Sequence, residues 1–267
     1  MLQLIKELRG KTGAGMGACK KALDETNNDI ERAIEYLRKQ GIAKAAKRGD
    51  KEASEGIIKL ALSDGKKTAY MIKVSAETDF VVRNEKFQNL TDKILETLKS
   101  VDVSDKRALL DAKMDENTAG DALANLSGTI GEKMEIKDVA VIKAAGTLSA
   151  YSHLGGKIGV LISLDKEGED DLAHDIAMQV AATDPKYLNP EEVPSEETDK
   201  EKEIYKEQLL KEGKPENIID KILEGKINKY YEEVCLLNQE YIKDDKKKVK
   251  DILGEVKIEK FIRFSLN

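Results

Sequence analysis

Apolar residues in the first 42 positions recur at helical spacing in three short groups, with glycine-rich and asparagine-rich breaks between them. The groups are Leu2, Ile5 and Leu8, then Ala18 and Leu23, and then Ile30, Ala33, Ile34 and Leu37. Side chains three or four positions apart line one face of a helix, so the pattern predicts three amphipathic helices ending near Gly41. Residues 43–53 contain only small and charged side chains and are expected to link an N-terminal domain, residues 1–42, to the rest of the chain.

A strand, a turn, a second strand and a helix are predicted next. The runs Glu55–Leu62 and Thr68–Ser75 are typical of a β-hairpin, and Asp64 with Gly65 is expected to supply the positive φ angles of a tight turn. One face of the second strand is expected to carry Tyr70, Ile72 and Val74. Asn84 is expected to cap the helix, whose apolar stripe consists of Phe87, Leu90, Ile94 and Leu98.

A similar order returns in Gly146–Leu164, which is predicted to turn at Gly155 and Gly156 and to precede a helix over residues 170–182. The apolar face of that helix consists of Leu172, Ile176 and Val180. The recurrence indicates an internal duplication, with core subdomains of residues 54–139 and 140–267.

Between the two copies, helices are predicted over residues 105–113 and 119–133 and a strand over residues 137–145. Antiparallel sheets that carry helices on one face would bury all these patterns. The predicted fold class is therefore α+β.

Residues 195–231 change to long, highly charged helical segments separated by Gly213 and Pro215, which predicts a helical hairpin at about residues 193–229. Its apolar positions are few, so the hairpin either projects as a coiled-coil arm or packs on the sheet as a solvated helix pair. The chain is expected to close with a short helix near Val249 and a strand over residues 260–266.

Composition narrows the class of protein. The 267 residues are 40% hydrophobic, sufficient for a core, and the net charge of −6 does not favour binding to nucleic acid phosphates. Cys19 and Cys235 lack the spacing of a metal site or disulfide framework, and no segment is typical of a signal peptide or a membrane span. A soluble cytoplasmic protein with a protein partner is expected, with no nucleic acid and no membrane partner.

Three features could indicate chemistry. Gly13–Ala18 matches a dinucleotide fingerprint, but an amphipathic helix instead of a strand precedes it, so a turn between helices is favoured. The glycine-lysine pairs near residues 65 and 156 are better explained as hairpin turns. His153 with a nearby carboxylate could form a hydrolase or transferase site, although no nucleophile motif surrounds it. No cofactor, metal or catalytic residue is expected.

Phe80 raises a question because only 4% of the residues are aromatic and this one follows a polar run at the end of a predicted strand. Patterning alone favours Phe80 and Val82 packing back onto the sheet, with Asp79 capping the turn. The residues by themselves lead only to a soluble α+β protein that binds another protein.

Several stretches together resemble the bacterial translation elongation factor Ts family, the nucleotide-exchange factors for elongation factor Tu, in the same order along nearly the whole chain. The stretches are residues 4–23, residues 29–48, "ETDFV" (77–81), "AYSHLGGKIGVLI" (150–162), residues 174–182, residues 213–237 and "FIRF" (261–264). The resemblance implies an N-terminal three-helix domain of the ubiquitin-associated type. It also implies a guanine-nucleotide exchange factor that binds elongation factor Tu in its GDP-bound and nucleotide-free forms.

The resemblance also implies which residues contact the partner. Four of them, Thr78, Asp79, Phe80 and Val81, would reach the nucleotide-binding domain and disturb its magnesium and phosphate sites, with Phe80 as the wedge. His153 would contact another domain of the partner. Leu8 and Met16 would contact the nucleotide-binding domain from a second direction.

The sequence departs from the family pattern in two places. Gly17 stands where a second methionine is common, and Gln239-Glu240-Tyr241 replaces a usual Gln-Pro-Phe. The first departure bears on the size of the apolar contact that the N-terminal helices would make. The alternative function is a protein-binding adaptor without exchange activity, acting through the helical hairpin.

Overall fold

The computed structural model describes residues 1–46 and 51–266, which form α-helices and antiparallel β-strands and confirm the predicted α+β class. Part of the predicted linker, residues 47–50, lies outside the described residues. The chain divides into two compact units. The first is Met1–Lys143 with Ser152–Gly159 and Phe264–Asn267, and the second is Ala144–Tyr151 with Val160–Arg263.

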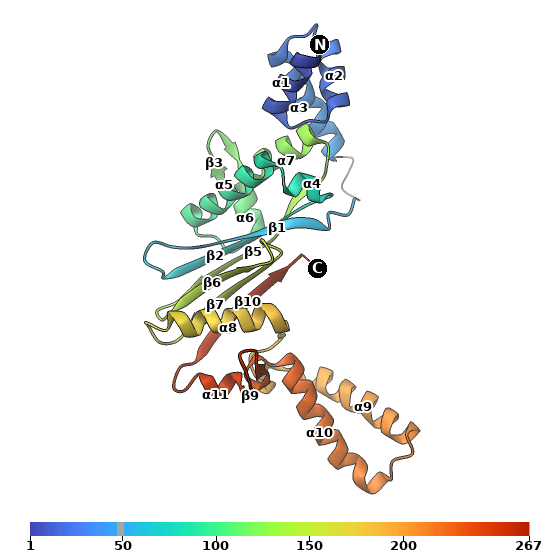
Figure 1. Ribbon diagram of the computed structural model, residues 1–267, viewed down its shortest axis with the longest axis vertical. Coiled ribbons are helices and arrows are strands. Elements are labelled where there is room, and N and C mark those ends of the chain that lie inside the picture. The colour runs from blue at the N-terminus through green and yellow to red at the C-terminus, as the bar shows by residue number, and fades with distance from the viewer. Residues whose placement is uncertain (47–50, 267) are drawn as a thin grey trace. The chain divides into compact units, whose positions relative to one another are not determined.

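Three helices open the first unit, as predicted: α1 (Leu2–Thr12), α2 (Met16–Glu25) and α3 (Ile30–Ala46) (Figure 1). Gly13 ends α1 with φ 76°, and its N–H donates to the Arg9 carbonyl at 2.7 Å. The glycine-rich segment is therefore a turn between two helices, which excludes the strand-first geometry of a dinucleotide site. Helix α3 continues five residues beyond its predicted end at Gly41.

The first sheet has the order β1-β2-β5, with β1 at Glu55–Leu62, β2 at Thr68–Ala76 and β5 at Met134–Lys143. Figure 1 shows α5, α6 and α7 on one side of this sheet. These helices span Glu85–Val101, Lys106–Asp111 and Ala119–Ile130. Between α6 and α7 lies a short hairpin of β3 (Lys113–Met114) and β4 (Asn117–Thr118). The residue pattern did not predict this hairpin, because strands of two residues are too short to show periodicity.

The turn between β1 and β2 differs from the prediction. Its residue with a positive φ angle is Lys66 (φ 51°), whereas neither Asp64 nor Gly65 adopts one. Ser63 closes the loop: its N–H donates to the Thr68 carbonyl at 2.8 Å, and its Oγ accepts the Thr68 N–H at 3.0 Å. The pairing of the strands leaves a loop longer than the two-residue turn that an Asp-Gly pair favours.

The core between this sheet and its helices confirms the predicted faces. Tyr70, Ile72 and Val74 of β2 are buried against α5. The predicted stripe of α5 is also buried, and it consists of Phe87, Leu90, Ile94 and Leu98. Asn84 caps α5 by accepting the Lys86 N–H at 2.9 Å. This cap fixes where α5 begins.

The second three-stranded sheet has the order β10-β7-β6, with β6 at Leu148–His153, β7 at Ile158–Leu164 and β10 at Ile258–Ser265. The predicted turn between β6 and β7 is confirmed, with φ angles of 66° at Gly155 and 90° at Gly156. Helix α8 (Asp170–Thr183) follows and buries Ile176 and Val180, while Leu172 is half-buried.

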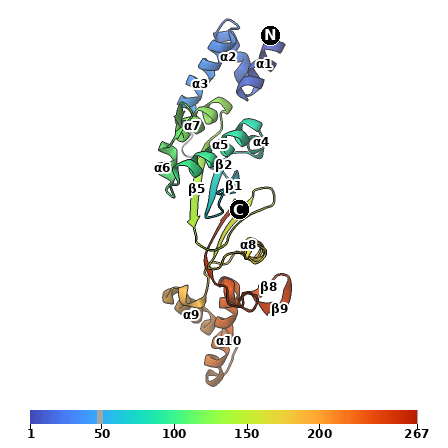
Figure 2. The same cartoon turned by 90° about the vertical axis from the view of Figure 1, so that its left-hand side faces the viewer.

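The predicted helical hairpin of the second unit consists of α9 (Ser195–Lys211) and α10 (Glu216–Val234), which run side by side (Figures 1 and 2). Gly213 adopts φ 73° after α9, and Pro215 caps α10. Figure 2 shows the small β8–β9 sheet beside α10. The remaining elements of this unit are η1 (Pro190–Glu192), η2 (Leu236–Asn238), β8 (Glu240–Tyr241), β9 (Asp244–Lys248) and α11 (Val249–Ile252).

A carboxylate with two phenol partners ties the base of the hairpin together. The Tyr187 hydroxyl donates to Glu197 Oε2 at 2.6 Å, and the Tyr230 hydroxyl donates to Oε1 of the same carboxylate. These hydrogen bonds hold the pKa of Glu197 below its ordinary value. The bond to Glu197 raises the pKa of Tyr187, and burial followed by the same carboxylate raises that of Tyr230. Charged Glu197 and neutral tyrosines are therefore the favoured states.

We expect Glu197→Gln to lower the melting temperature at neutral pH. A lowered carboxyl pKa stabilises the fold above the ordinary glutamate pKa of about 4.3, and this stability is lost as pH falls through the folded-state value. Raised phenol pKa values stabilise the fold below about pH 10, and this stability is lost above it. The difference between wild type and variant should thus be largest between about pH 5 and 9. Thermal unfolding across pH tests this, with Glu203→Gln, an exposed change on the same helix, as control.

Candidate functional site

A single helical turn, α4 (Asp79–Val82), follows β2 after Glu77 and Thr78, and it carries three of the four predicted contact residues, Asp79, Phe80 and Val81. The Arg83 N–H donates to the Asp79 carbonyl at 3.0 Å, and the Asn84 N–H donates to the Val81 carbonyl at 2.9 Å. Asp79 also pairs with Arg83 at 3.0 Å on the surface. Asp79 therefore occupies the first position inside the turn, and Thr78, not Asp79, holds the cap position before it.

The turn places two neighbouring apolar side chains in opposite environments. Phe80 is 81% exposed, whereas Val81 is 4% exposed and belongs to the core beneath α5. Val82 is half-buried against the same core. The expectation that Phe80 packs back onto the sheet is wrong. It assumed that the two-residue alternation of β2 continues, whereas a helical turn rotates each residue by about 100° from the last.

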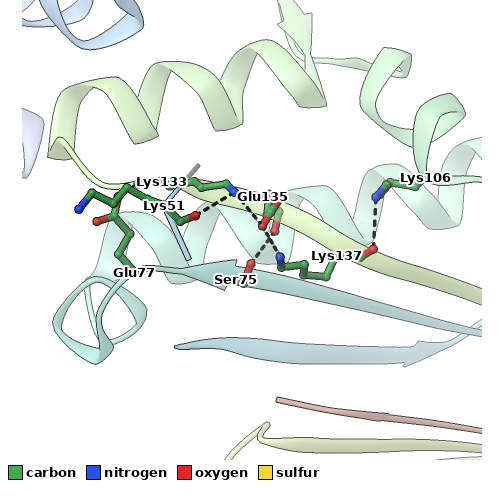
Figure 3. Close-up of polar contacts among 7 residues, drawn as sticks. All are labelled: Lys51, Ser75, Glu77, Lys106, Lys133, Glu135 and Lys137. Atoms are coloured by element: carbon green, nitrogen blue, oxygen red, sulfur yellow. Dashed lines mark hydrogen bonds and ion pairs between the residues drawn. The ribbon is translucent and has the colours of Figure 1, made fainter. Parts of the chain in front are cut away.

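Two glutamates, Glu77 and Glu132, join the contact element to the residues just before β5. The Thr78 N–H donates to Glu132 Oε2 at 3.0 Å, and its hydroxyl donates to Glu132 Oε1 at 2.9 Å. Glu77 Oε1 accepts the Lys133 N–H at 2.6 Å, a pair that Figure 3 displays. These side-chain bonds end the strand at Ala76 and hold the backbone from which Phe80 projects. Glu132 was not identified from the sequence, because its partner lies 54 positions away.

Glu135 of β5 extends this polar group. In Figure 3 it lies between Lys133 and Lys137, and Lys133 Nζ lies 3.5 Å from its Oε1. Burial raises the pKa of Glu135, but the hydrogen bond and charge of Lys137, aided by Lys133, outweigh burial and leave its pKa below the ordinary value. The carboxylate is therefore charged at neutral pH. Lys133 Nζ also donates to the Lys51 carbonyl at 3.0 Å, which ties the chain before β1 to the same group.

His153 lies at the end of β6, exposed beside the tight turn to β7. Its carbonyl accepts the N–H groups of Gly156 and Lys157, both at 3.2 Å. The next residue, Leu154, is 61% exposed and has φ 50°. The sequence pointed to His153 but not to Leu154, because a leucine between two strands is usually expected to be buried in the core.

The tip of this turn is fixed on β1. The Ile58 N–H donates to the Gly156 carbonyl at 2.7 Å, and a Cβ at Gly156 would lie 2.8 Å from the Ile57 side chain. Only glycine suits this close approach at φ 90°. The turn that carries His153 and Leu154 thus contacts β1, and β2, the strand paired with β1, precedes Phe80.

The two contact residues predicted in the N-terminal helices differ in their exposure to solvent. Met16 is 62% exposed at the start of α2, whereas Leu8 is fully buried among the three helices. In this structure the Leu8 side chain has no exposed surface and packs against the other apolar residues of the three helices. Two further apolar side chains, Met1 and Leu2, are 53% and 73% exposed, and the helical pattern had assigned Leu2 to the buried face.

Both cysteines lie in the interior of the protein. Cys19 and Cys235 are both buried with free thiols, and burial raises the pKa of Cys235 to about 11. The ring of His174 packs edge-on against Tyr151 at 5.3 Å. Across residues 1–46 and 51–266, no three histidine, cysteine or acidic side chains gather as metal ligands would. Within the same residues, no helix combines the length and apolarity needed to cross a membrane.

Comparison with known proteins gives a consistent result over almost the whole chain. The sequence model of a family described as "Elongation factor TS" matches residues 77–267. Relatives named elongation factor Ts include those of Halothermothrix orenii, 44% identical over 98% of this chain and 90% of the relative, and Clostridium novyi, 44% identical over 98% and 91%. That of Chlorobaculum parvum is 43% identical over 98% of this chain and 96% of its own. The chain belongs to the elongation factor Ts family.

Proposed function

We propose that this protein is a guanine-nucleotide exchange factor that binds elongation factor Tu and promotes GDP release during translation elongation. The observation that carries the proposal is Phe80, a large apolar side chain that is 81% exposed on a backbone held by buried and hydrogen-bonded neighbours. Leaving a phenylalanine in water forgoes about 1.5–3 kcal/mol of burial. A binding partner that covers the ring would recover this free energy.

The four residues of the contact element have different roles in this proposal. Phe80 is the wedge that enters the nucleotide-binding domain near the magnesium and phosphate sites, and Asp79 lies beside it on the surface. Thr78 and Val81 anchor the turn, one through Glu132 and the other through the core. A wedge on a fixed base loses little conformational freedom on binding, which strengthens association.

The required coupling exceeds what one side chain supplies. Weakening nucleotide binding about 10⁴-fold needs roughly 5.5 kcal/mol of differential binding, and the ring of Phe80 contributes at most about 3. A specific complex also buries about 1,000 Å² or more. We therefore include His153 with Leu154, and Met16, as further contacts to the partner. Reciprocity requires that returning nucleotide weakens this protein's binding by the same factor.

We further propose a domain division that serves this function. Residues 1–42 form a domain of the ubiquitin-associated type, residues 43–53 link it to a duplicated core of residues 54–139 and 140–267, and the α9–α10 hairpin is a coiled-coil arm. The protein acts in the cytoplasm on GDP-bound and nucleotide-free elongation factor Tu, without a cofactor, and contacts neither nucleic acid nor membrane.

The test is the release rate of a fluorescent GDP analogue from purified elongation factor Tu, with excess unlabelled GDP, as this protein is titrated. Release should accelerate and then saturate as the complex becomes fully populated. Unchanged release with a cognate partner would contradict exchange activity. Binding without acceleration would favour the adaptor function instead.

A further inference from the structure

A cleft of ≈ 290 Å³ in the first unit is lined by cationic and amide side chains. It lies where α1 and α3 face α5, β4 and α7. Its polar lining consists of Lys11, Thr12, Arg38, Lys86, Asn117, Asn125 and Thr129. None of the described residues that line it is acidic, although acidic residues outnumber basic ones in the chain as a whole. Such a lining selects for an anion.

Lys86 lacks a carboxylate partner among the residues that the structure describes. It occupies the first turn of α5, and its stem lies beside Gly13, where an added Cβ would be 3.4 Å from Lys86 Cδ. Burial lowers the pKa of Lys86, since part of the hydration of its charge is lost. A partly buried cation without a counter-charge is unfavourable unless an anion compensates for it.

Arg38 is oriented by one bond and has donors remaining. Its Nε donates to Asn125 Oδ1 at 3.0 Å, and its two terminal amino groups have no described protein acceptor. Accepting this bond fixes which end of the Asn125 amide is the oxygen and leaves its NH₂ group as a donor. Guanidinium and amide donors held in place in this way suit the oxygens of a phosphate group.

Carboxylates near the cleft compete only weakly. Glu7 and Glu31 lie 3.4 and 3.7 Å from Lys11 Nζ, with side chains 48% and 83% exposed. Exposed pairs of this kind contribute about 0–1 kcal/mol and are screened by salt. Lys11 can therefore turn toward an anion in the cleft at small cost.

We propose that this cleft binds a small phosphate anion, with Lys86 and Arg38 as its principal ligands and Lys11 at its rim. The volume is at the lower limit of small-molecule pockets, about 300 Å³, which suits inorganic phosphate or pyrophosphate, or the diphosphate group of a nucleotide whose base stays outside. The site is separate from the proposed exchange element. Lys86 lies in the first turn of α5, after the cap residue Asn84, and none of Thr78–Val81 lines the cleft.

The test is isothermal titration calorimetry of the full-length protein with sodium pyrophosphate, at low and at physiological ionic strength. Wild type should bind one anion per chain, more weakly as salt increases. Lys86→Gln should weaken binding at least about tenfold, since a hydrogen bond to a charged group contributes about 1.5–3 kcal/mol. The control is Lys93→Gln on the same helix, whose amine pairs with Asp115 at 2.7 Å outside the cleft, and it should bind as wild type does.

A second arm replaces pyrophosphate with ADP and follows the backbone amide NMR signals of Lys86 and Asn125. Shifts with both ligands that depend on Lys86 would assign the site to diphosphate groups in general, and shifts with pyrophosphate alone would assign it to the free anion. The proposal is overturned if neither ligand saturates. Equal weakening by Lys86→Gln and Lys93→Gln would overturn it as well, because that would indicate unspecific charge attraction.

Discussion

Phe80→Ala should slow the stimulated release of GDP from elongation factor Tu by about 10- to 100-fold while leaving the fold intact. The ring is 81% exposed, so its removal takes no contact from the core. In the complex, the variant would lose the burial of a phenylalanine, about 1.5–3 kcal/mol, and each 1.4 kcal/mol corresponds to tenfold. Single-turnover release at several concentrations of the variant would measure the effect.

Two matched variants separate a wedge from a general loss of apolar surface. Leu210→Ala removes a side chain that is 47% exposed on the helical hairpin, and release should stay at the wild-type rate. Val81→Ala should instead lower the free energy of unfolding, by about 1.6 kcal/mol for two buried methyl groups plus the cost of a cavity. Wild-type release by a folded Phe80→Ala protein would refute the wedge.

The sequence was sufficient for the fold wherever one residue pattern extends over a whole element. The faces of β2 and α5 follow from alternation and from helical spacing, and Asn84 indicated the start of α5 because its side chain caps the next turn locally. The hairpin of α9 and α10 was similarly marked by Gly213 and Pro215. In each case, the interaction that fixes the element is close in sequence.

The candidate site was harder to predict from the sequence, because its geometry depends on hydrogen-bond partners that are distant along the chain. Alternation along β2 would place Phe80 on the same face as Tyr70, but the hydrogen bonds from Thr78 to Glu132 end the strand and a helical turn begins. That change of period exposes Phe80 and buries Val81. No local pattern identifies Glu132 as the hydrogen-bond partner of Thr78 at this change from strand to helical turn.

Similar reasons explain other features that the sequence did not determine. Leu8 and Met16 are both apolar and near the same glycines, and only packing of three helices decides that one is buried and the other is 62% exposed. The loop after β1 depends on the side chain of Ser63, which competes with the Asp-Gly signal. The spacing of residues along the chain also did not predict that α3 packs closely against α7.

Gly41→Ala should destabilise the first unit, although alanine is the better helix former. Gly41 lies in α3 against α7, where a Cβ would be 2.0 Å from the Gly128 carbonyl oxygen and 2.4 Å from its Cα. Backbone atoms within a helix cannot yield locally, so the helices must separate. Overpacking of this kind costs about 1–3 kcal/mol, and the propensity gain of up to about 1 kcal/mol opposes it.

Gly10→Ala is the matched control, because Gly10 is also helical and an added Cβ there meets no atom within 4 Å. It should stabilise the protein by up to about 1 kcal/mol, so the two substitutions should have opposite signs in urea unfolding. Hydrogen exchange should also accelerate in α7 of the Gly41→Ala protein alone. Separation of α3 from α7 moves Met16 relative to Phe80, so stimulated GDP release should fall if both contact one partner. Equal stability of the two variants would show that the glycine contact does not hold the N-terminal helices in place.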